Sequence, residues 1–472
     1  MGGVRTKGSA PLAISDKTWK LGLLIDIGST FTKVSVIEPD GTFVDSAHAP
    51  TTILTEVSAG VEMAVGNMQH GLTEFDWVLT SSSAAGGLRM ATVGLTEALS
   101  GNAGVLAALG AGAKVVAVEA GILDQESLAR ISASEPHLLL LTGGTDGGNS
   151  SGLMHNAKLL SDLAELPGVI VAGNDKVARQ AADLLVNGGA TDVRVVDNVF
   201  PKPGEIVIAP TREAVRDLFM EHITRAKGLT SFLNSVNSDC EPTPLAVSRA
   251  LWGHLENSGD PIVLIDVGGA TTDVHSVGGI IHRQRSVDLP TPDVLRTVEG
   301  DLGMRWGAPG IVQSLGERLS LLLAGDTDLK QQAQRRHDDP SFLPENEIDR
   351  EIDVILAKGA IVLALERHAG RVVVRHNAWG DRHRVVGKDL RDCRTLIATG
   401  GVFRHSEDPV LMIKGALAVA TEAFVPRNPH IVVDRDYSIY AIGLVARHDL
   451  TLAKKMLQRV IDPELLTCET TL

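Results

Sequence analysis

Cysteine is scarce in this chain of 472 residues. The three cysteines, Cys240, Cys393 and Cys468, lie far apart, and none belongs to a CxxC motif. This spacing argues against a zinc knuckle or a Cys-ligated cluster within one chain, and it favours a reducing, cytoplasmic setting. Residues 1–20 lack the apolar core of a signal peptide, so we expect them to form a flexible N-terminal tail.

Aromatic residues, long apolar runs and basic residues are also few. Aromatics make up only 3% of the chain, so the core has to consist mainly of Leu, Val, Ile and Ala. No run of 18 apolar residues occurs, which predicts that the protein does not span a membrane. The net charge of −14 argues against nucleic acid as the main partner, because phosphate contacts need clustered Lys and Arg. The oligomeric state stays open, and a homo-oligomer is possible.

The chain has no GxxxxGK[ST] motif and therefore no Walker-type phosphate loop. It has instead one short pattern that occurs twice. An apolar strand ends in Asp26 and is followed by a Gly/Ser/Thr loop and a hairpin, and the same order recurs at Asp266. We call these segments the first and the second Asp loop.

Further marks suggest that the whole chain is duplicated. Apolar runs end in Thr-Gly-Gly at Thr142–Gly144 and at Thr399–Gly401, and a buried strand is expected after each, at 169–172 and 431–433. Because these marks follow the two Asp loops in the same order, we pair them as equivalents in an internal repeat.

Between the expected strands lie segments whose apolar residues have helical spacing. We expect helices at 59–68, 176–187, 244–255 and 347–368. Alternating strands and helices predict an α/β fold with mainly parallel sheets. A chain of this length is too long to fold around a single hydrophobic core. We therefore expect a duplicated two-lobe architecture with a cleft between the lobes. The predicted units are a first lobe at 21–255 with an inserted segment near 191–228, a second lobe at 256–436 and C-terminal helices at 437–472.

The two Asp loops suggest phosphate chemistry. Glycines let backbone N–H groups approach a polyphosphate, and hydroxyl side chains add donors. Magnesium takes one or two carboxylates together with phosphate oxygens, so Asp26 and Asp266 are candidate metal ligands. Lys33 is a candidate phosphate contact or simply a solvated strand residue. The remaining candidates for ATP contact are Gly28, Ser29, Thr30, Gly268, Gly269, Thr271, Thr272, Gly400 and Gly401.

The order of the two Asp loops and Thr399–Gly401 resembles the actin–Hsp70–sugar kinase superfamily. The resemblance implies that these stretches are its two phosphate motifs and its adenosine motif. It further implies that the segment Ala441–Leu444 belongs to the helix that closes the second interdomain connection.

A narrower resemblance covers roughly residues 20–450. The stretches 26–33, 141–149, 171–174 and 296–305 together are similar to the MutL-type accessory protein of glutamate mutase. This resemblance implies an ATP-dependent factor that serves an adenosylcobalamin-dependent mutase or aminomutase and releases damaged cobalamin from it.

Three features allow more than one interpretation. The stretch from Arg296 to Arg305 is either a loop that enters the nucleotide cleft or a charged helix cap. Asp146 is either a catalytic residue, orienting the attacking water or contacting Mg²⁺ through water, or a simple turn residue. The segment Asp273–Gly278 formally matches a corrin-binding D-x-H-x-x-G pattern through His275, and we interpret this match as chance because it lies in a predicted hairpin.

The leading functional hypothesis is a slow, Mg²⁺-dependent ATPase that acts as a molecular switch. The main alternative is a small-molecule kinase on the same fold, with Asp146 as the candidate base. An iron–sulfur activator needs suitably placed cysteines, which the chain lacks. A filament protein that uses ATP only to polymerise is a further alternative.

Overall fold

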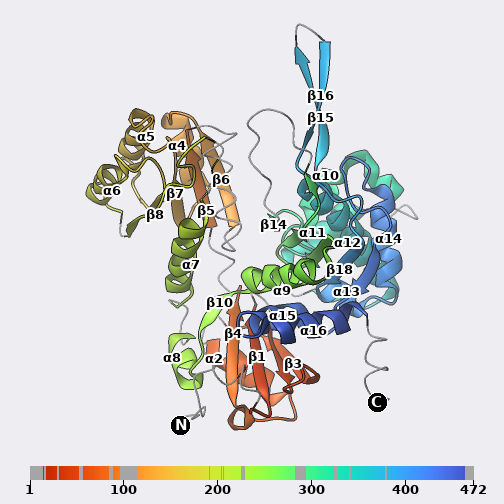
Figure 1. Ribbon diagram of the computed structural model, residues 1–472. Helices are drawn as coiled ribbons and strands as arrows, with labels where there is room; N and C mark the ends of the chain where they lie inside the picture. The colour runs from red at the N-terminus through yellow and green to blue at the C-terminus, as the bar shows by residue number, and fades with distance from the viewer. Residues whose placement is uncertain are drawn as a thin grey trace.

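The computed structural model describes residues 14, 18–28, 31–52, 57–83, 89–95, 114–190, 192–203, 205, 207–224, 229–281, 294–322, 328–339, 342–377 and 380–462. Within this part of the chain the strands form three five-stranded sheets and two small two-stranded sheets. The three large sheets occupy separate regions of the molecule, with helices packed around each (Figure 1).

The first sheet has the order β10-β4-β1-β2-β3. Its strands are β1 (Gly22–Ile27), β2 (Phe31–Ile37), β3 (Phe43–Pro50), β4 (Trp77–Ser82) and β10 (Cys240–Pro242). β2 is antiparallel to both β1 and β3, whereas β4 is parallel to both β1 and β10. All six residues of β1 are buried, as expected for an apolar central strand that is covered on both faces.

The second sheet has the order β14-β12-β11-β18-β19. Its strands are β11 (Ile262–Val267), β12 (Thr272–Val277), β14 (Val294–Glu299), β18 (Thr395–Thr399) and β19 (His430–Val433). The pattern of parallel and antiparallel neighbours is the same as in the first sheet. The predicted duplicated α/β fold, with two lobes built on equivalent sheets, is confirmed.

This topology also corrects one part of the predicted repeat. The strand equivalent to β18 is β4, and the strand equivalent to β19 is β10. The Thr142–Gly144 stretch instead follows β7, which belongs to the third sheet, so pairing it with Thr399–Gly401 is wrong. Two strands can end in the same three residues without occupying equivalent places, because strand order depends on contacts that are distant in sequence.

The third sheet is inserted into the first lobe between β4 and β10. Its order is β6-β5-β7-β8-β9, and every neighbouring pair is parallel. The strands are β5 (Arg89–Gly94), β6 (Lys114–Ala120), β7 (Leu138–Leu141), β8 (Gly168–Val171) and β9 (Val193–Val195). The segment 191–228, which we predicted as the insertion, contains β9 and the whole of α7, whereas the sheet already begins at Arg89. The boundaries of the lobes stay predictions.

Helices cover these sheets. In the first lobe and its insertion they are α2 (Val57–Gly66), α4 (Gln125–Ala133), α5 (Ser151–Leu160), α6 (Ala178–Asn187), α7 (Ala209–Thr224), α8 (Leu229–Val236) and α9 (Thr243–Ser258), with a 3₁₀ turn η1 (Leu72–Glu74). In the second half they are α10 (Ala308–Leu315), η3 (Gly316–Leu321), α11 (Leu329–Asp338), α12 (Glu347–His368), α13 (Gly401–His405), α14 (Pro409–Val419), α15 (Ser438–Ala446) and α16 (Leu450–Ile461). The helices expected at 59–68, 176–187, 244–255 and 347–368 are all present.

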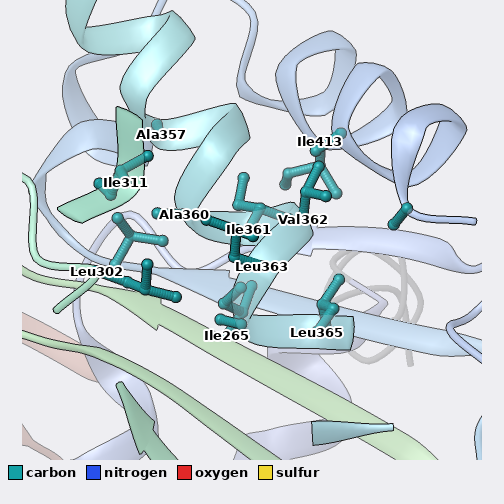
Figure 2. Close-up of a cluster of buried hydrophobic side chains, with 14 of the residues drawn as sticks. Ile265, Leu302, Ile311, Ala357, Ala360, Ile361, Val362, Leu363, Leu365 and Ile413 are labelled. Atoms are coloured by element: carbon teal, nitrogen blue, oxygen red, sulfur yellow. The ribbon is translucent and has the colours of Figure 1, made fainter. Parts of the chain in front are cut away.

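The long helix α12 organises the core of the second lobe. Its N-cap residue Asn346 accepts a hydrogen bond from the Asp349 N–H, and the positive charge of Arg367 in its last turn complements the helix dipole. Figure 2 shows its apolar side chains facing Ile265 of β11 on one side and Ile413 of α14 on another. Burial of this kind contributes about 25 cal/mol per Å² of apolar surface.

A separate core joins the two lobes. It combines residues of β1 and β4 with residues of β11 and β18, and the helices α9, α15 and α16 lie between them. An ideal Cβ placed on Gly443 of α15 would lie 1.9 Å from the Ala246 carbonyl oxygen of α9, so the two helices touch backbone to backbone. The lobes therefore meet through a tightly packed helix pair.

Candidate functional site

The two Asp loops have the same local backbone. The Gly28 N–H donates to the Phe31 carbonyl at 3.1 Å, and the Gly268 N–H donates to the Thr271 carbonyl at 2.9 Å. An ideal Cβ would lie only 2.5 Å from the acceptor oxygen at Gly28 and 3.0 Å from it at Gly268. Both turns therefore need glycine. Ser29 and Thr30 lie outside the described residues.

The strand registers around the two aspartates are also equivalent. Asp26 lies opposite Lys33 in β2 and Ser81 in β4. Asp266 lies opposite Asp273 in β12 and Thr399 in β18. The duplication therefore extends to single residues, and the chemistry at equivalent positions differs: a lysine in one half corresponds to an aspartate in the other.

Asp26 is 2% exposed and is held from three sides. Its Oδ1 accepts hydrogen bonds from Ser81 Oγ at 3.1 Å and from Thr243 Oγ1 at 2.5 Å, and Lys33 Nζ lies 3.6 Å from its Oδ2. Thr243 is the first residue of α9, so the carboxylate also lies at the N-terminal end of that helix, where negative charge is favoured. These contacts fix the orientation of the Asp26 carboxylate.

Asp266 differs from Asp26 in its electrostatics. Removal from water raises the pKa of the Asp266 carboxyl to about 7. The charges of Asp273, Asp26 and Asp434 act in the same direction, whereas the positive charge of Lys33 opposes them. An additional cation near Asp266 would therefore be strongly favoured.

Lys33 connects the two lobes. Burial works to lower the pKa of Lys33, but the charges of Asp26 and Asp266, and then those of Tyr437 and Asp434, outweigh burial and raise it. Its ammonium also lies 4.3 Å from the centre of the Tyr437 ring. Asp26 belongs to the first lobe and Asp266, Asp434 and Tyr437 to the second, so the side chain of Lys33 lies where the lobes meet.

The second Asp loop is held from outside by the segment that follows β14. The Gly268 carbonyl accepts from the Met304 N–H at 2.9 Å, and the Gly269 carbonyl accepts from the N–H groups of Arg305 and Trp306 at 2.8 and 3.1 Å. The stretch from Arg296 to Arg305 is therefore a strand end and a loop, and the alternative of a helix cap is wrong. A Cβ on Gly303 would lie 2.3 Å from the Ala270 carbonyl carbon, which explains the glycine there.

The hydroxyl groups of the second Asp loop are already used within the protein. Thr271 Oγ1 donates to Asp273 Oδ2 at 2.9 Å, and Asp273 is in turn paired with Arg296. The fully buried Thr272 donates to the Leu302 carbonyl at 2.7 Å. Thr272 thus attaches the loop to its neighbour, a role that the sequence did not suggest.

The Thr399–Gly401 stretch lies directly beside the second Asp loop. Gly400 has φ +121°, and an ideal Cβ there would lie 2.4 Å from the Val267 carbonyl oxygen. Gly401 begins α13, whose Arg404 lies 5.5 Å from the centre of the Tyr437 ring. The Tyr437 ring therefore lies near cations from both lobes, Lys33 and Arg404.

Asp146 lies in the inserted third sheet, in the loop after β7. Its Oδ1 accepts from Asn198 Nδ2 at 2.8 Å and from the Asp175 N–H at 3.1 Å. None of the hydrogen bonds described for this carboxylate reaches either Asp loop. Its contacts are those of a residue that holds neighbouring loops together.

His275 of the corrin-like pattern and two of the cysteines are buried in the structure. His275 lies within β12, is 3% exposed, and its Nδ1 is 3.1 Å from Ser248 Oγ, so it is not on a loop that could reach a corrin. Cys240 and Cys393 are both buried, and burial raises the pKa of both thiols, that of Cys393 to about 12. Cys468 lies outside the described residues.

Sequence reasoning missed several residues of the site: Ser81, Thr243, Asp273, Asp434 and Tyr437. Asp434 caps α15 by accepting from the Ser438 and Ile439 N–H groups, and Asp-x-x-x-Ser before an apolar helix was a usable signal. Tyr437 has φ +53°, which is unusual for a residue other than glycine. Nothing local in the sequence indicates this conformation.

Some absences within the described residues limit the chemistry. No group of three or more His, Cys, Asp or Glu side chains is arranged there to hold a metal ion. A metal that takes only one or two carboxylates and completes its shell with phosphate and water, as Mg²⁺ does, suits Asp26 and Asp266. None of the helices described in the structure has the length and apolar character needed to cross a membrane.

The comparisons with known proteins agree with the sequence resemblance. The family model described as MutL protein matches residues 22–461. The Protein MutL of Clostridium tetanomorphum is 36% identical in an alignment of 443 positions that covers 90% of this chain and 95% of that protein.

Among solved structures, the chain is similar to a glycerol dehydratase reactivase, with a TM-score of 0.35, 12% identity and coverage of 90% of this chain and 99% of the other. It is also similar to component A of the (R)-2-hydroxyglutaryl-CoA dehydratase of Acidaminococcus fermentans, with a TM-score of 0.32, 10% identity and coverage of 93% and 99%. At such scores these two similarities say nothing about function. The family model and the Clostridium relative, by contrast, each cover nearly the whole chain, and the chain belongs to the MutL protein family.

Proposed function

We propose that this protein binds Mg²⁺ and ATP between its two Asp loops and hydrolyses ATP slowly, as an accessory factor for an adenosylcobalamin-dependent mutase or aminomutase. The observation that carries the nucleotide site is Lys33, whose charge is balanced by carboxylates from both lobes. We expect the protein to act in the cytoplasm.

The glycine geometry supports a polyphosphate ligand. Gly28 and Gly268 leave no space for a side chain, so the backbone of each loop can approach a ligand closely. We assign phosphate contact to Gly28, Ser29 and Thr30 in the first loop and to Gly268, Gly269 and the backbone of Thr271 in the second, because the Thr271 hydroxyl is bonded to Asp273. Gly400 and Gly401 are assigned to the base side of the nucleotide.

The carboxylates of Asp26 and Asp266 support a divalent cation, held directly or through water. The bound ion would neutralise negative charge on the phosphates during transfer, while Lys33 adds a positive point charge. Because Asp266 is partly shielded from water and lies among like charges, a bound cation would offset the negative charge around its carboxylate.

The small-molecule kinase is less well supported. It requires a carboxylate base beside the reacting phosphate, and Asp146 was the candidate. Asp146 is engaged by Asn198 and by the backbone of Asp175 in a different sheet from either Asp loop. The mutase client is supported by membership in the MutL family.

The nucleotide site is tested by ATP binding and hydrolysis in the presence of Mg²⁺. We expect Asp266→Asn to lower turnover at least about tenfold, which corresponds to about 1.4 kcal/mol of lost stabilisation. The matched control is Asp146→Asn, which should leave turnover within about twofold of the unsubstituted protein. Unchanged turnover in Asp266→Asn would remove the assignment, and a large loss in Asp146→Asn would favour the kinase.

The client is tested separately by capture from the native source. The tagged full-length chain is incubated with extract in the presence of ATP or ADP, and captured proteins are identified. We expect a cobalamin-dependent enzyme whose recovery changes with the nucleotide. Intact ATP hydrolysis without any such recovery would retain the nucleotide site and exclude the client.

A further inference from the structure

The turn before α15 holds Tyr437 in an unusual backbone conformation. Tyr437 has φ +53° and ψ +39°, in the left-handed region that costs free energy for any residue with a Cβ. In the described part of the chain, only Glu135 and Asn237 share a positive φ without being glycine. A backbone cost of this kind persists where the surrounding structure requires one direction of the side chain.

The neighbours of Tyr437 hold this turn in place. Asp434, which is 4% exposed, accepts hydrogen bonds from the first two N–H groups of α15 at 2.8 and 3.2 Å. Arg435 Nη1 donates to the Arg404 carbonyl of α13 at 2.8 Å, and all nine residues of α15 are buried. The side chain of Tyr437 is therefore directed by a turn that is anchored to two helices.

The Tyr437 side chain reaches from one end of the proposed nucleotide site to the other. The Lys33 ammonium, on the phosphate side, lies 4.3 Å from the ring centre. On the base side, the Tyr437 hydroxyl oxygen would lie 3.8 Å from an ideal Cβ on Gly401. Burial raises the pKa of the Tyr437 phenol above its ordinary value of 10, so the ring is uncharged at neutral pH. The contact with Lys33 is thus one between a cation and a π face.

The Lys33 ammonium makes few directed bonds. Its Nζ lies 3.6 Å from Asp26 Oδ2, which is longer than a hydrogen bond, and the described residues contain no hydrogen bond from this ammonium. An aromatic face attracts an ammonium electrostatically but offers it no lone pair. The contact with Tyr437 therefore fixes the ammonium while its N–H groups stay available to a ligand.

We propose that Tyr437 is a positioning residue that holds the Lys33 ammonium for the phosphate oxygens of ATP. This inference rests on the proposed function and adds to it the residue that orients Lys33. Without the ring, the ammonium is drawn onto the nearby Asp26 carboxylate, and its donors are used within the protein before the nucleotide binds. The left-handed backbone of Tyr437 follows from this role, because the ring has to reach a lysine of the other lobe.

The first experiment detects the contact without nucleotide. The full-length chain is labelled with ¹³C at the lysine Cε, and the Lys33 signal is identified in NMR spectra by its loss in Lys33→Arg. Protons above an aromatic face resonate upfield of their usual position, so we expect the Lys33 signal to be shifted upfield. Tyr437→Phe should keep this shift and Tyr437→Leu should lose it. The same signal position in the unsubstituted chain and in Tyr437→Leu would overturn the proposal.

The second experiment is a double-mutant cycle that separates positioning from a purely structural role. We expect Tyr437→Leu to weaken binding of a fluorescent Mg²⁺–ATP analogue by about threefold to thirtyfold, the range of partly to fully desolvated cation–π contacts. Tyr437→Phe keeps the ring and should bind within about twofold of the unsubstituted chain. Added to Lys33→Met, Tyr437→Leu should cause no further loss, because the two residues act as one unit. Fully additive losses would show that Tyr437 acts independently of Lys33 and would contradict the proposal.

The matched control for the backbone is Glu135→Leu. Glu135 has φ +43°, is exposed and lies between α4 and β7, so the variant places leucine in the same kind of conformation outside the site. It should bind the analogue normally. Equal loss of affinity in this control would show that binding follows general stability, and the proposal would be wrong.

The outcomes also distinguish this role from the nucleotide site itself. Binding of the analogue by the unsubstituted chain, with unchanged affinity in Tyr437→Leu, would refute the role of Tyr437 and retain the site. An upfield-shifted Lys33 signal in an unsubstituted chain that binds no analogue would refute the proposed nucleotide site, and the role of Tyr437 with it.

Discussion

At the scale of single residues, Lys33 has the most telling surroundings. It comes from the first lobe, contacts Asp26 of the same lobe, and interacts with Asp266, Asp434 and Tyr437 of the other. A charge in this position can respond to a ligand and to the relative position of the lobes. From the sequence alone, Lys33 could equally be a phosphate contact or a solvated strand residue, because its partners lie up to about four hundred residues away in the chain.

We expect Lys33→Met to weaken binding of a fluorescent Mg²⁺–ATP analogue by about tenfold to a hundredfold. Hydrogen bonds to charged groups contribute about 1.5–3 kcal/mol, which corresponds to this range. Lys158→Met on the exposed side of α5 is the control and should bind the analogue normally. Equal affinity in Lys33→Met would show that Lys33 does not contact the nucleotide.

A buried histidine predicts how stability depends on pH. Burial, followed by the charges of Lys388 and His275, lowers the pKa of His368 well below its usual value. Its Nδ1 and Nε2 lie 2.9 Å from Thr297 Oγ1 and 2.8 Å from Ser276 Oγ. The neutral ring is therefore retained in the folded state, whereas the unfolded chain takes up a proton below about pH 6.5.

Folding stability should consequently fall as the pH drops below about 6.5, by up to about 1.4 kcal/mol per pH unit for this group. Urea unfolding at pH 7.5, 6.5 and 5.5 measures the effect. His368→Gln should be less stable at pH 7.5 but lose less on acidification, whereas exposed His405→Gln should follow the unsubstituted protein. An identical pH slope in His368→Gln would contradict this assignment.

At the scale of elements, the pair of α9 and α15 determines how closely the lobes approach. We expect Gly443→Ala to cost roughly 1–3 kcal/mol of unfolding free energy, because its Cβ would overlap the Ala246 carbonyl and the helices would have to separate. The control is Gly253→Ala in α9, where the nearest atoms would be at an ordinary 3.5 Å. That variant should be unchanged or more stable by up to about 1 kcal/mol. Equal stabilities would mean that the contact is not tight.

The elements of the fold also show how much of the structure could be predicted from the sequence. The Asp26 and Asp266 loops were predictable because each is local, a strand end followed by glycine, and the long apolar pattern of α12 was equally clear. The equivalence of Ser81 with Thr399 was not, since it depends on which strand pairs with β1 and β11. The bond from Thr243 to Asp26 spans 217 residues, and no local pattern encodes such a partner.

The position of Asp146 in the fold depends on distant contacts in the same way. Asp146 follows a buried strand and glycines, and its loop resembles the two Asp loops locally. Its strand β7 nevertheless belongs to the inserted sheet. When the five strands of the inserted sheet are numbered 1 to 5 along the chain, their order across the sheet is 2-1-3-4-5. This order could be established only from the strand pairing in the structure.

At the scale of the whole molecule, each lobe has a core of its own and shares a third core with the other lobe. Side chains of β1, β4, β11 and β18 share one apolar cluster with α9, α15 and α16. We therefore expect residues 1–258, expressed alone, to be unfolded, and to become folded when coexpressed with residues 259–472. Copurification of the halves and circular dichroism check this expectation. A cooperative thermal transition of the first half alone would contradict it.

The inserted sheet has a consequence for engineering. In the first lobe, a complete parallel sheet is accommodated between β4 and β10, although these strands remain neighbours. The equivalent connection in the second lobe, from β18 to β19, contains only α13, α14 and a short segment in which Arg427 and Asn428 are exposed. By the symmetry of the duplication, the position between Arg427 and Asn428 is where a reporter domain can be grafted while the sheet keeps its order.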